Sequence, residues 1–228
     1  DGAFAEYIKV PAKRLHKLPD NISFEEGAMI EPFACCVHGV KELTGVDVED
    51  FVVVSGPGAI GLLCLQVARA SGARTAVIGT EADVKRLELA RELGADYTFQ
   101  AGKDDVLREI RNISGGQGAD VVIEASGAAP AVDMGFDIAK KRGKYLQIGL
   151  FGKPISTAFE KIAYKELQIF GSFAQKWSAW KCALKLLEDE KVRLKPLVSD
   201  ALPLGEWEKG FNKLLNKEGY KILLYPNT

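Results

Sequence analysis

Several features that would point to a particular class of protein are scarce or missing in this chain of 228 residues. Its 30 basic and 31 acidic residues leave a net charge of −1, so the sequence predicts no binding face for nucleic acid or for an anionic membrane. The cysteines have no CxxC spacing and lie in apolar stretches of helical pattern, which favours reduced thiols and a cytoplasmic protein. They are Cys35, Cys36, Cys64 and Cys182.

The chain also has no long uninterrupted hydrophobic run. Its most apolar stretch, residues 51–70, is broken by three glycines and a proline, and no signal-peptide pattern opens the chain, so we expect no membrane span. No internal repeat or low-complexity tract is visible. The hydrophobic content of 47% suffices for the core of one full domain and part of another, and a small, nearly neutral ligand or an internal partner fits this composition better than nucleic acid or a membrane.

From residue 51 onward, short apolar runs alternate with helical patterns. Each run of four to six apolar residues followed by a helix is typical of a strand that crossover helices cover on both faces. The pattern predicts an α/β fold with a doubly wound parallel sheet, the Rossmann arrangement. Gly94 and Gly143 are placed where helices end. The strand candidates are FVVVS at 51–55, TAVIG at 75–79, YTF at 97–99, VVIEA at 121–125, KYLQIG at 144–149 and LQIFGSF at 167–173.

The two ends of the chain do not fit that sheet. Residues 1–20 have the pattern of an edge strand and irregular chain, and Ser23 with Glu26 predicts a capping box that starts a helix. Pro32 is expected to interrupt this helix, which resumes to about Leu43. A helix at 205–215 and a lone strand at 220–226 close the chain. We expect the end strands to pair with each other or with chain upstream, or to be poorly anchored.

Three glycines form the pattern GxGxxG directly after a predicted strand and before a predicted helix. Gly56 permits a tight turn, Gly58 lets the backbone approach a pyrophosphate, and Gly61 allows the helix and the strand to pack closely. The helix N-terminus would supply free N–H groups to the phosphates. The sequence therefore predicts a dinucleotide-binding loop, and a glycine-rich turn without a ligand is the alternative.

Glu81 lies twenty positions after the last of these glycines, at the end of the next strand. A carboxylate there accepts hydrogen bonds from both ribose hydroxyls of NAD and repels the 2′-phosphate of NADP. Alternatively, Glu81 only favours the N-terminus of the following helix, in competition with Asp83. Arg86 is placed either beside the adenine or against a 2′-phosphate, which keeps NADP as the less favoured cofactor.

These motifs and others spread over the whole chain resemble the medium-chain, zinc-type alcohol dehydrogenases, within them the sorbitol (L-iditol) and threonine dehydrogenase branch. The resemblance rests on GAFAEYIKVPAKRLHKLPD, IEPFACCVHG, VVVSGPGAIGLLCLQVARASGA, RLELARELGAD, VVIEASG, YLQIGLFG, GSFAQKWSAW, LPLGEWEKGF and YKILLYP. It implies remnants of a second, mainly β, catalytic domain at both ends. The implied division is residues 1–32 as remnant and connecting helix, 33–175 as dinucleotide-binding domain, and 176–228 as the return toward the catalytic domain.

The resemblance implies that most catalytic-zinc ligands lie outside this sequence. Glu31 matches the glutamate of the family's EP motif, so it is expected to reach the zinc directly or through water. As the residue before a proline, Glu31 would project at a kink between two helical pieces. The alternative is a solvated glutamate at a broken helix. The chain taken alone is expected to bind a dinucleotide without turning over an alcohol.

Further cofactor contacts follow from the resemblance, on the nicotinamide side, although plain core packing explains some of them equally well. They are Ala59, Ile60, Ile148, Gly149, Leu150, Ser172, Phe173 and Ala174. Sorbitol dehydrogenases carry an arginine and a tyrosine after the phenylalanine that matches Phe173. This chain has Ala174 and Gln175 there, which makes sorbitol itself a doubtful substrate.

Other side chains are weaker candidates. Trp177 and Trp180 either wall a substrate pocket or, more in keeping with their helical spacing, make core or interdomain contacts. His16 and His38 are each a possible proton relay, but less favoured than a structural role. The helical setting of Cys35 and its neighbour favours burial over zinc ligation.

Together these observations predict the cofactor-binding portion of an oxidoreductase that transfers hydride between a secondary alcohol and NAD, with zinc in the full-length protein. A polyol, a hydroxy amino acid or another secondary alcohol is the expected substrate. A homo-oligomer, dimer or tetramer, is expected through the strand at 167–173. Two alternatives stay open: a non-catalytic, nucleotide-sensing domain, and a zinc-free relative of the quinone reductases.

Overall fold

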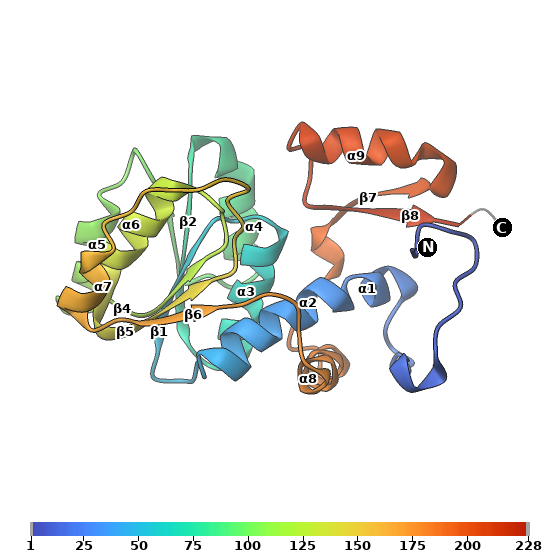
Figure 1. The fold of residues 1–228 in the computed structure, drawn as a ribbon, viewed down its shortest axis with the longest axis horizontal. Helices are drawn as coiled ribbons and strands as arrows, with labels where there is room; N and C mark the ends of the chain where they lie inside the picture. Colours follow the sequence, from blue (N-terminus) through green and yellow to red (C-terminus); the bar gives the residue numbers. More distant parts are fainter. Residues whose placement is uncertain (1, 227–228) are drawn as a thin grey trace.

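Six parallel strands form one twisted sheet in the computed structural model, which describes residues 2–226 (Figure 1). The order of the strands across the sheet is β3-β2-β1-β4-β5-β6, so the strand order switches between β1 and β4: β2 and β3 lie on one side of β1, and β4 to β6 lie on the other. This order confirms the predicted doubly wound α/β fold. The strands are β1 Phe51–Ser55, β2 Arg74–Gly79, β3 Tyr97–Gln100, β4 Ala119–Glu124, β5 Ala139–Gln147 and β6 Gln168–Gly171.

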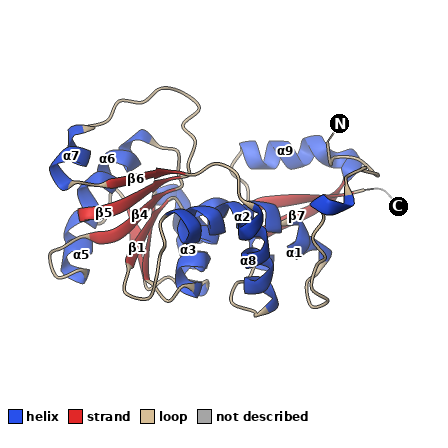
Figure 2. Cartoon of the chain, turned by 60° about the horizontal axis from the view of Figure 1, so that its bottom comes forward, coloured by secondary structure: helices blue, strands red, loops and turns tan. Residues whose placement is uncertain are grey.

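Both faces of the sheet are covered because successive side chains of a strand point to opposite sides. Along β1, Val52 and Val54 belong to one hydrophobic cluster, whereas Phe51 and Val53 belong to another. The first cluster includes residues of α3 and α4, and the second includes residues of α5 and α6, so helices flank the sheet on either side (Figure 2). These helices are α3 Ala59–Ala70, α4 Val84–Glu92, α5 Val106–Ile113 and α6 Ala129–Ile138; α7 Glu160–Lys165 lies beside β5.

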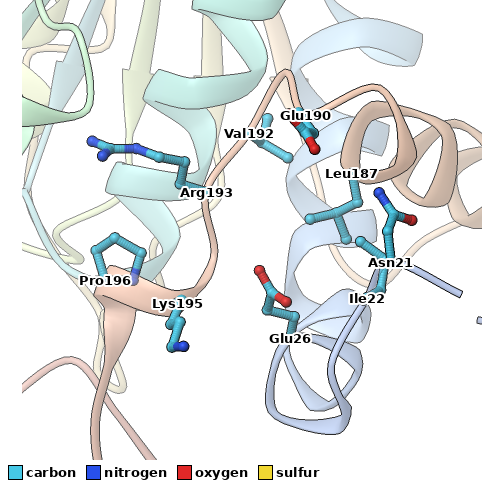
Figure 3. A pocket seen from close by; sticks show the side chains of 9 residues that line it. All are labelled: Asn21, Ile22, Glu26, Leu187, Glu190, Val192, Arg193, Lys195 and Pro196. Carbon is cyan, nitrogen blue, oxygen red and sulfur yellow. The ribbon is translucent and has the colours of Figure 1, made fainter. Parts of the chain in front are cut away.

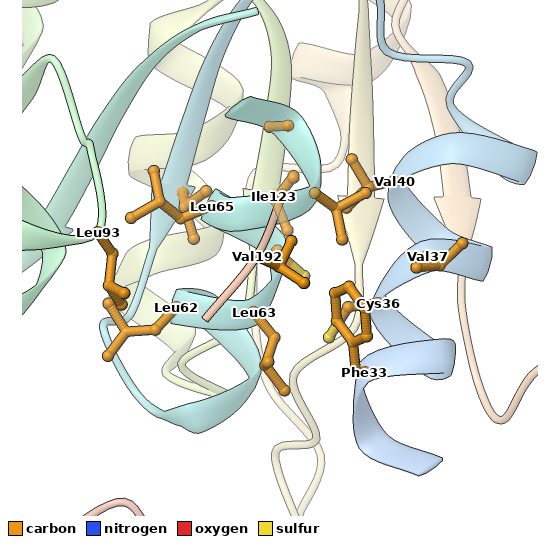
Figure 4. Close-up of a cluster of buried hydrophobic side chains, with 14 of the residues drawn as sticks. Phe33, Cys36, Val37, Val40, Leu62, Leu63, Leu65, Leu93, Ile123 and Val192 are labelled. Atoms are coloured by element: carbon orange, nitrogen blue, oxygen red, sulfur yellow. The ribbon is translucent and has the colours of Figure 1, made fainter. Parts of the chain in front are cut away.

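A second layer of helices packs on α3. Helix α2, Ile30–Val37, continues into a π-helical turn, His38–Leu43, and contacts both α3 and α8, Trp177–Glu188. Phe33 is fully buried where α2 meets α3 (Figure 4). Side chains separated by 140 or more positions in the sequence therefore share one core. The predicted division at residues 32/33 and 175/176 stays a prediction.

The capping box at the start of α1, Phe24–Ala28, is confirmed: the Ser23 hydroxyl accepts a hydrogen bond from Glu26 N, and the Glu26 carboxylate accepts one from Ser23 N. The expected interruption at Pro32 is wrong in position. The break lies at Met29, and Pro32 is the third residue of α2. A proline is tolerated in the first turn because the N–H groups there have no partner within the helix.

The far end of the chain differs from the expectation of a lone strand. Strand β8, Lys221–Tyr225, pairs in parallel with β7, Val198–Pro203, a strand that the sequence analysis did not recognise. Helix α9, Trp207–Leu215, makes the crossover between them (Figure 1). The strand therefore has its own local partner.

The expected edge strand near the N-terminus is also absent from the described residues. Residues 2–11 have no strand, and a single 3₁₀ turn, Ala12–Arg14, is the first regular element. Phe4 and Tyr7 are 70% and 90% exposed. A strand requires a hydrogen-bonded neighbour, and within residues 2–226 none lies beside this segment.

The two glycines that were assigned to helix ends behave differently. Gly94 has φ +97° just after α4, as expected of a residue that ends a helix. The assignment of Gly143 was wrong, because this residue lies inside β5. An added Cβ there would lie 2.9 Å from the carbonyl oxygen of Lys140, so the glycine serves a close backbone approach within a bulge.

The described helices are short. The longest, α3 and α8, have 12 residues each, whereas a helix needs about 20 apolar residues to cross a bilayer. Within residues 2–226 no helix meets this requirement.

Candidate dinucleotide-binding site

The three glycines after β1 adopt the geometry that a phosphate-binding loop requires. Gly56 has φ +97°, which only glycine adopts easily, and an added Cβ would lie 2.7 Å from Ser126 N. At Gly61 an added Cβ would lie 1.9 Å from the Gly56 carbonyl oxygen, so the loop closes tightly on the helix. At Gly58 no atom lies within 4 Å of an added Cβ. The second glycine therefore faces open space, where a ligand can approach the backbone.

Helix α3 begins at this loop with a bare N-terminus. Its N-cap is Gly58, no side chain caps it, and its first turn contains no acidic residue. The first N–H groups of a helix have no partner within it, and they carry part of the positive end of the helix dipole. Leu62 N is the first to bond back, to Gly58 O at 2.9 Å. The start of α3 can therefore bind a negatively charged group.

Two further loops leave the same edge of the sheet. Residues 148–150 follow β5, and residues 172–174 follow β6, and Ser172 N donates to Gln147 O at 2.9 Å. Leu150 and Phe173 are 72% and 82% exposed, so neither is a core residue; Ile148 packs partly into the core, as the alternative interpretation held. Ala174 has φ +62°. The structure thus brings the predicted cofactor contacts to one edge of the sheet.

The Ser172 side chain has a polar atom without a partner. The residue is 7% exposed, and its Oγ makes no hydrogen bond with residues 2–226. The oxygen atom is itself buried, so it is an unpaired polar atom of the interior and is not open to a ligand in this arrangement.

Glu81 lies just after β2, as the first residue of a 3₁₀ turn, Glu81–Asp83. Asp83, rather than Glu81, caps this turn: its Oδ2 accepts from Thr80 N at 3.0 Å and from Thr80 Oγ1 at 2.8 Å. Glu81 lines a hollow of about 440 Å³, together with Lys217 and Tyr220 from the far end of the chain. Asp83 thus makes the capping hydrogen bonds, while Glu81 lies in the same first turn with its carboxylate exposed, so both interpretations of Glu81 stay open.

Arg86 is engaged with the chain itself. Its Nη2 donates to the Gly219 carbonyl oxygen at 3.1 Å, its Nη1 lies 3.5 Å from Asp83 Oδ1, and its guanidinium lies 5.5 Å from the centre of the Tyr220 ring. To bind a 2′-phosphate, Arg86 would have to give up some of these contacts.

Glu31, in the first turn of α2, is exposed and lies next to a cysteine thiol. Cys35 Sγ is 3.6 Å from Glu31 Oε1 and donates a hydrogen bond to Gln175 Oε1 at 3.0 Å. Burial and the nearby Glu31 charge raise the pKa of the Cys35 thiol to about 12. The expected backbone distortion before Pro32 is wrong, because Glu31 is helical.

The environment of Cys35 predicts a slow thiol. At pH 8 the group is protonated, so alkylation by iodoacetamide should be far slower than that of an ordinary thiol. The variant Glu31→Gln removes the negative charge beside Cys35, so the pKa of the Cys35 thiol should fall. Its alkylation rate at pH 9–10 should therefore rise roughly threefold to tenfold. Peptide mass spectrometry over a pH series measures this, with Glu208→Gln on α9 as control. Equal alkylation rates of Cys35 in the wild type and in both variants would contradict the contact between Glu31 and Cys35.

A complete zinc site cannot be built from this part of the chain. Within residues 2–226 no three histidine, cysteine, aspartate or glutamate side chains come together in a way that could hold a metal. Cys36 is fully buried, and its Sγ donates to Ile60 O at 3.5 Å. A catalytic zinc needs about three protein ligands, so Glu31 alone does not suffice.

The weaker candidates have structural partners. The centre of the His16 ring lies 3.9 Å from that of Trp177 and 5.4 Å from that of Trp180, so both tryptophans of α8 pack against the N-terminal segment that carries His16. His38 is buried, and its Nδ1 lies 2.6 Å from Glu42 Oε2. Neither histidine lies in the glycine loop. The hollow of about 600 Å³ in Figure 3 lies elsewhere, among Asn21, Leu187, Lys195 and their neighbours.

Sequence reasoning missed Glu124. It is the last residue of β4 and fully buried, and its carboxylate accepts hydrogen bonds from the loop that follows. A signal was present, since an acidic residue interrupts the apolar run VVIEA at its fourth position, two residues before Ser126. A buried acid at the end of a parallel strand is uncommon without a specific role.

Comparison with known proteins gives one family match, covering residues 59–189: the zinc-binding dehydrogenases. The chain is 41% identical over 227 residues to a sorbitol dehydrogenase of Halalkalibacterium halodurans, which covers 99% of the chain and 66% of that relative. It is 35% identical to a D-arabitol-phosphate dehydrogenase of Enterococcus avium, over 100% of the chain and 65% of the relative. The chain therefore spans slightly less than two thirds of the length of these relatives.

Solved structures agree with the fold over nearly the whole chain. A protein from Sinorhizobium meliloti 1021, described as a zinc-binding dehydrogenase and bound to NADP, matches with a TM-score of 0.88 and 31% identity, over 99% of this chain and 66% of that one. The 2R,3R-butanediol dehydrogenase of Bacillus subtilis matches with a TM-score of 0.83 and 28% identity, over 93% and 60%. The resemblance drawn from the motifs is thereby confirmed, and the chain belongs to the zinc-binding dehydrogenase family.

Proposed function

We propose that this chain binds NAD along the carboxyl edge of its parallel sheet, as part of an oxidoreductase that transfers hydride between NAD and the carbon of a secondary alcohol. The observation that carries the proposal is the glycine loop, where Gly58 faces open space at the uncapped start of α3. Open backbone at a helix N-terminus suits a pyrophosphate. The switch point between β1 and β4 is where sheets of this kind bind their ligands.

The order of the strands gives the proposed ligand a direction. Glu81 follows β2, on one side of the glycine loop, and accepts the hydroxyls of the adenosine ribose. The loops after β4, β5 and β6 lie on the other side and line the nicotinamide half. Bound NAD supplies the hydride acceptor. The exposed Leu150 and Phe173 are placed to shield that end from water.

We propose NAD rather than NADP as the cofactor because of the charged side chains that follow β2. The Glu81 carboxylate is exposed, since Asp83 does the capping, and a 2′-phosphate would meet its negative charge. Arg86, which lines the same hollow as Glu81 and could offset that repulsion, is held by Gly219 and Asp83. The Sinorhizobium relative was solved with NADP, so the preference needs a direct test.

Replacement of Glu81 by glutamine should weaken NAD binding about tenfold and narrow the preference over NADP, because hydrogen bonds to a charged acceptor are lost. Calorimetric titration of both dinucleotides into each protein measures the effect. The control is Glu88→Gln, an exposed glutamate two turns further along, on α4. Tighter binding of NADP than NAD by the unchanged chain would overturn the assignment.

The metal and the substrate are further parts of the proposal. Glu31 is proposed to contribute to a zinc site in the whole protein, directly or through water, with ligands other than those of residues 2–226. The names of the relatives, sorbitol and D-arabitol-phosphate dehydrogenase, support a polyol or a related secondary alcohol as substrate. Gln175, which accepts from Cys35 beside Glu31, is placed to contribute to the choice of alcohol.

Association of two or more copies through β6 is also proposed. β6 is the last strand of the sheet and has a neighbour on one side, β5, and Ile169 on it is 43% exposed. An unpaired edge of this kind can be covered by a second copy. A cytoplasmic location, expected from the spacing of the cysteines, completes the proposal.

A further inference from the structure

The carboxylate of Glu124 is buried at the end of β4 and satisfied entirely by neutral donors. Its Oε1 accepts from Ser126 N at 2.8 Å, from Ser126 Oγ and from Gly127 N at 3.1 Å, and its Oε2 accepts from Gln147 Nε2 at 2.7 Å. The residue is 0% exposed, and within residues 2–226 no lysine or arginine forms an ion pair with it. Burying a carboxylate costs free energy unless its oxygens are hydrogen-bonded, and these donors satisfy both oxygens of Glu124.

The donors come from two places, the loop after β4 and the last residue of β5. Ser126 and Gly127 follow β4, whereas Gln147 ends β5, and its Nε2 also donates to Gly149 O at 2.8 Å. The main-chain oxygen of Glu124 accepts from Ile148 N and Gly149 N, at 3.0 and 2.9 Å. Side chain and backbone of one residue therefore hold both loops.

These loops are also in backbone contact with each other and with the phosphate-binding loop. A Cβ added at Gly149 would lie 2.5 Å from Gly127 N. A Cβ added at Gly56 would lie 2.7 Å from Ser126 N. Between Gly127 and Gly149 this close approach leaves no room for one loop to move alone. A displacement of the loop after β4 would therefore be transmitted to the loop after β5.

We propose that Glu124 is a positioning residue, which holds the loops after β4 and β5 in the arrangement that receives the nicotinamide half of the dinucleotide. The inference rests on the proposed NAD binding. An acid is required there because every partner is a donor, and a carboxylate accepts at both oxygens. Glutamine at this position would turn an N–H₂ group toward N–H donors and break part of the network.

The test compares a whole dinucleotide with its adenosine half. In Glu124→Gln, NAD affinity should fall about tenfold or more, because the nicotinamide-side loops lose their support, while AMP affinity should stay within about twofold. A purely structural role would alter both ligands equally or neither. Asp133→Asn is the matched control: Asp133 Oδ1 accepts from Thr157 Oγ1 at 2.7 Å and Ala158 N at 3.0 Å, so it also bonds a loop through a carboxylate.

Equal losses for NAD and AMP, or undiminished NAD affinity in folded Glu124→Gln, would overturn the inference and leave the proposed function intact. Should this variant fail to fold, Ser126→Ala removes a single donor, and it should weaken NAD about threefold with AMP unchanged. Unchanged NAD affinity in that variant would also overturn the inference. A wild-type chain that binds neither ligand would instead overturn the proposed function, and this inference with it.

Discussion

The variant Gly58→Val is expected to lose NAD affinity by a factor of about a hundred or more while the protein stays folded. No atom lies within 4 Å of a Cβ at this position, so the valine side chain would meet no protein atom near its base. Gly58 has φ −73° and ψ −178°, an extended conformation that valine adopts readily. The added side chain would instead occupy the approach of the pyrophosphate to the start of α3.

Calorimetric titration with NAD, together with thermal unfolding of the same sample, separates binding from stability. The control is Gly205→Val, because Gly205 is exposed and, like Gly58, has a negative φ and nothing beyond its chain neighbours within 4 Å of an added Cβ. Gly61 is unsuitable as a test position or as a control, because a Cβ there would lie 1.9 Å from Gly56 O and would disturb the fold itself. A folded Gly58→Val protein that binds NAD like the wild type would remove this loop from the proposed site.

The second large expected effect is the absence of turnover by the 228-residue chain alone. With NAD, added zinc and a panel of polyols, threonine and secondary alcohols, we expect no NADH above background. Residues 2–226 offer no group of three side chains that could hold a metal, and zinc chemistry on an alcohol needs about three protein ligands and a fixed geometry.

The same preparation should still bind NAD, which shows that the sample is folded and competent for the cofactor. NADH formation by the purified chain that stops when a chelator is added would show that a working metal site lies in these residues after all. Glu31→Gln then provides the follow-up, because Glu31 is the side chain that the family resemblance connects to zinc.

The sheet was predictable from the sequence because its signals are local. The run at Phe51–Ser55 is apolar at every position but the last, as expected of a strand covered on both faces, and it is buried throughout. GxGxxG was informative because a strand and a helix flank it. The capping box of Ser23 was equally local, since its two residues lie three positions apart.

The errors arose where structure depends on partners distant in the sequence. The segment at residues 2–11 has strand-like composition but no neighbouring strand, so composition alone could not decide it. Strand β7, Val198–Pro203, was missed because its short polar and apolar mixture becomes a strand only beside β8. Gly143 was assigned to a helix end because the bulge in β5 depends on its contact with β4.

The candidate site divides in the same way. Each glycine of the loop carried its own signal, and the role of Glu81 was predicted from its spacing, whereas the capping hydrogen bonds of Asp83 emerged only from the structure. Glu124 and Gln147 were not found: the acidic residue within VVIEA was visible, but the buried network that joins it to the second loop has no sequence pattern. The contact between Cys35 and Gln175 links positions 140 residues apart, and likewise had no local signature.

Calorimetric titration of NAD into the wild-type chain tests the central claim most directly. The account predicts saturable binding of one NAD per chain, with AMP as a weaker competitor for the same site. A folded chain that shows no saturable binding of NAD or NADP would contradict it.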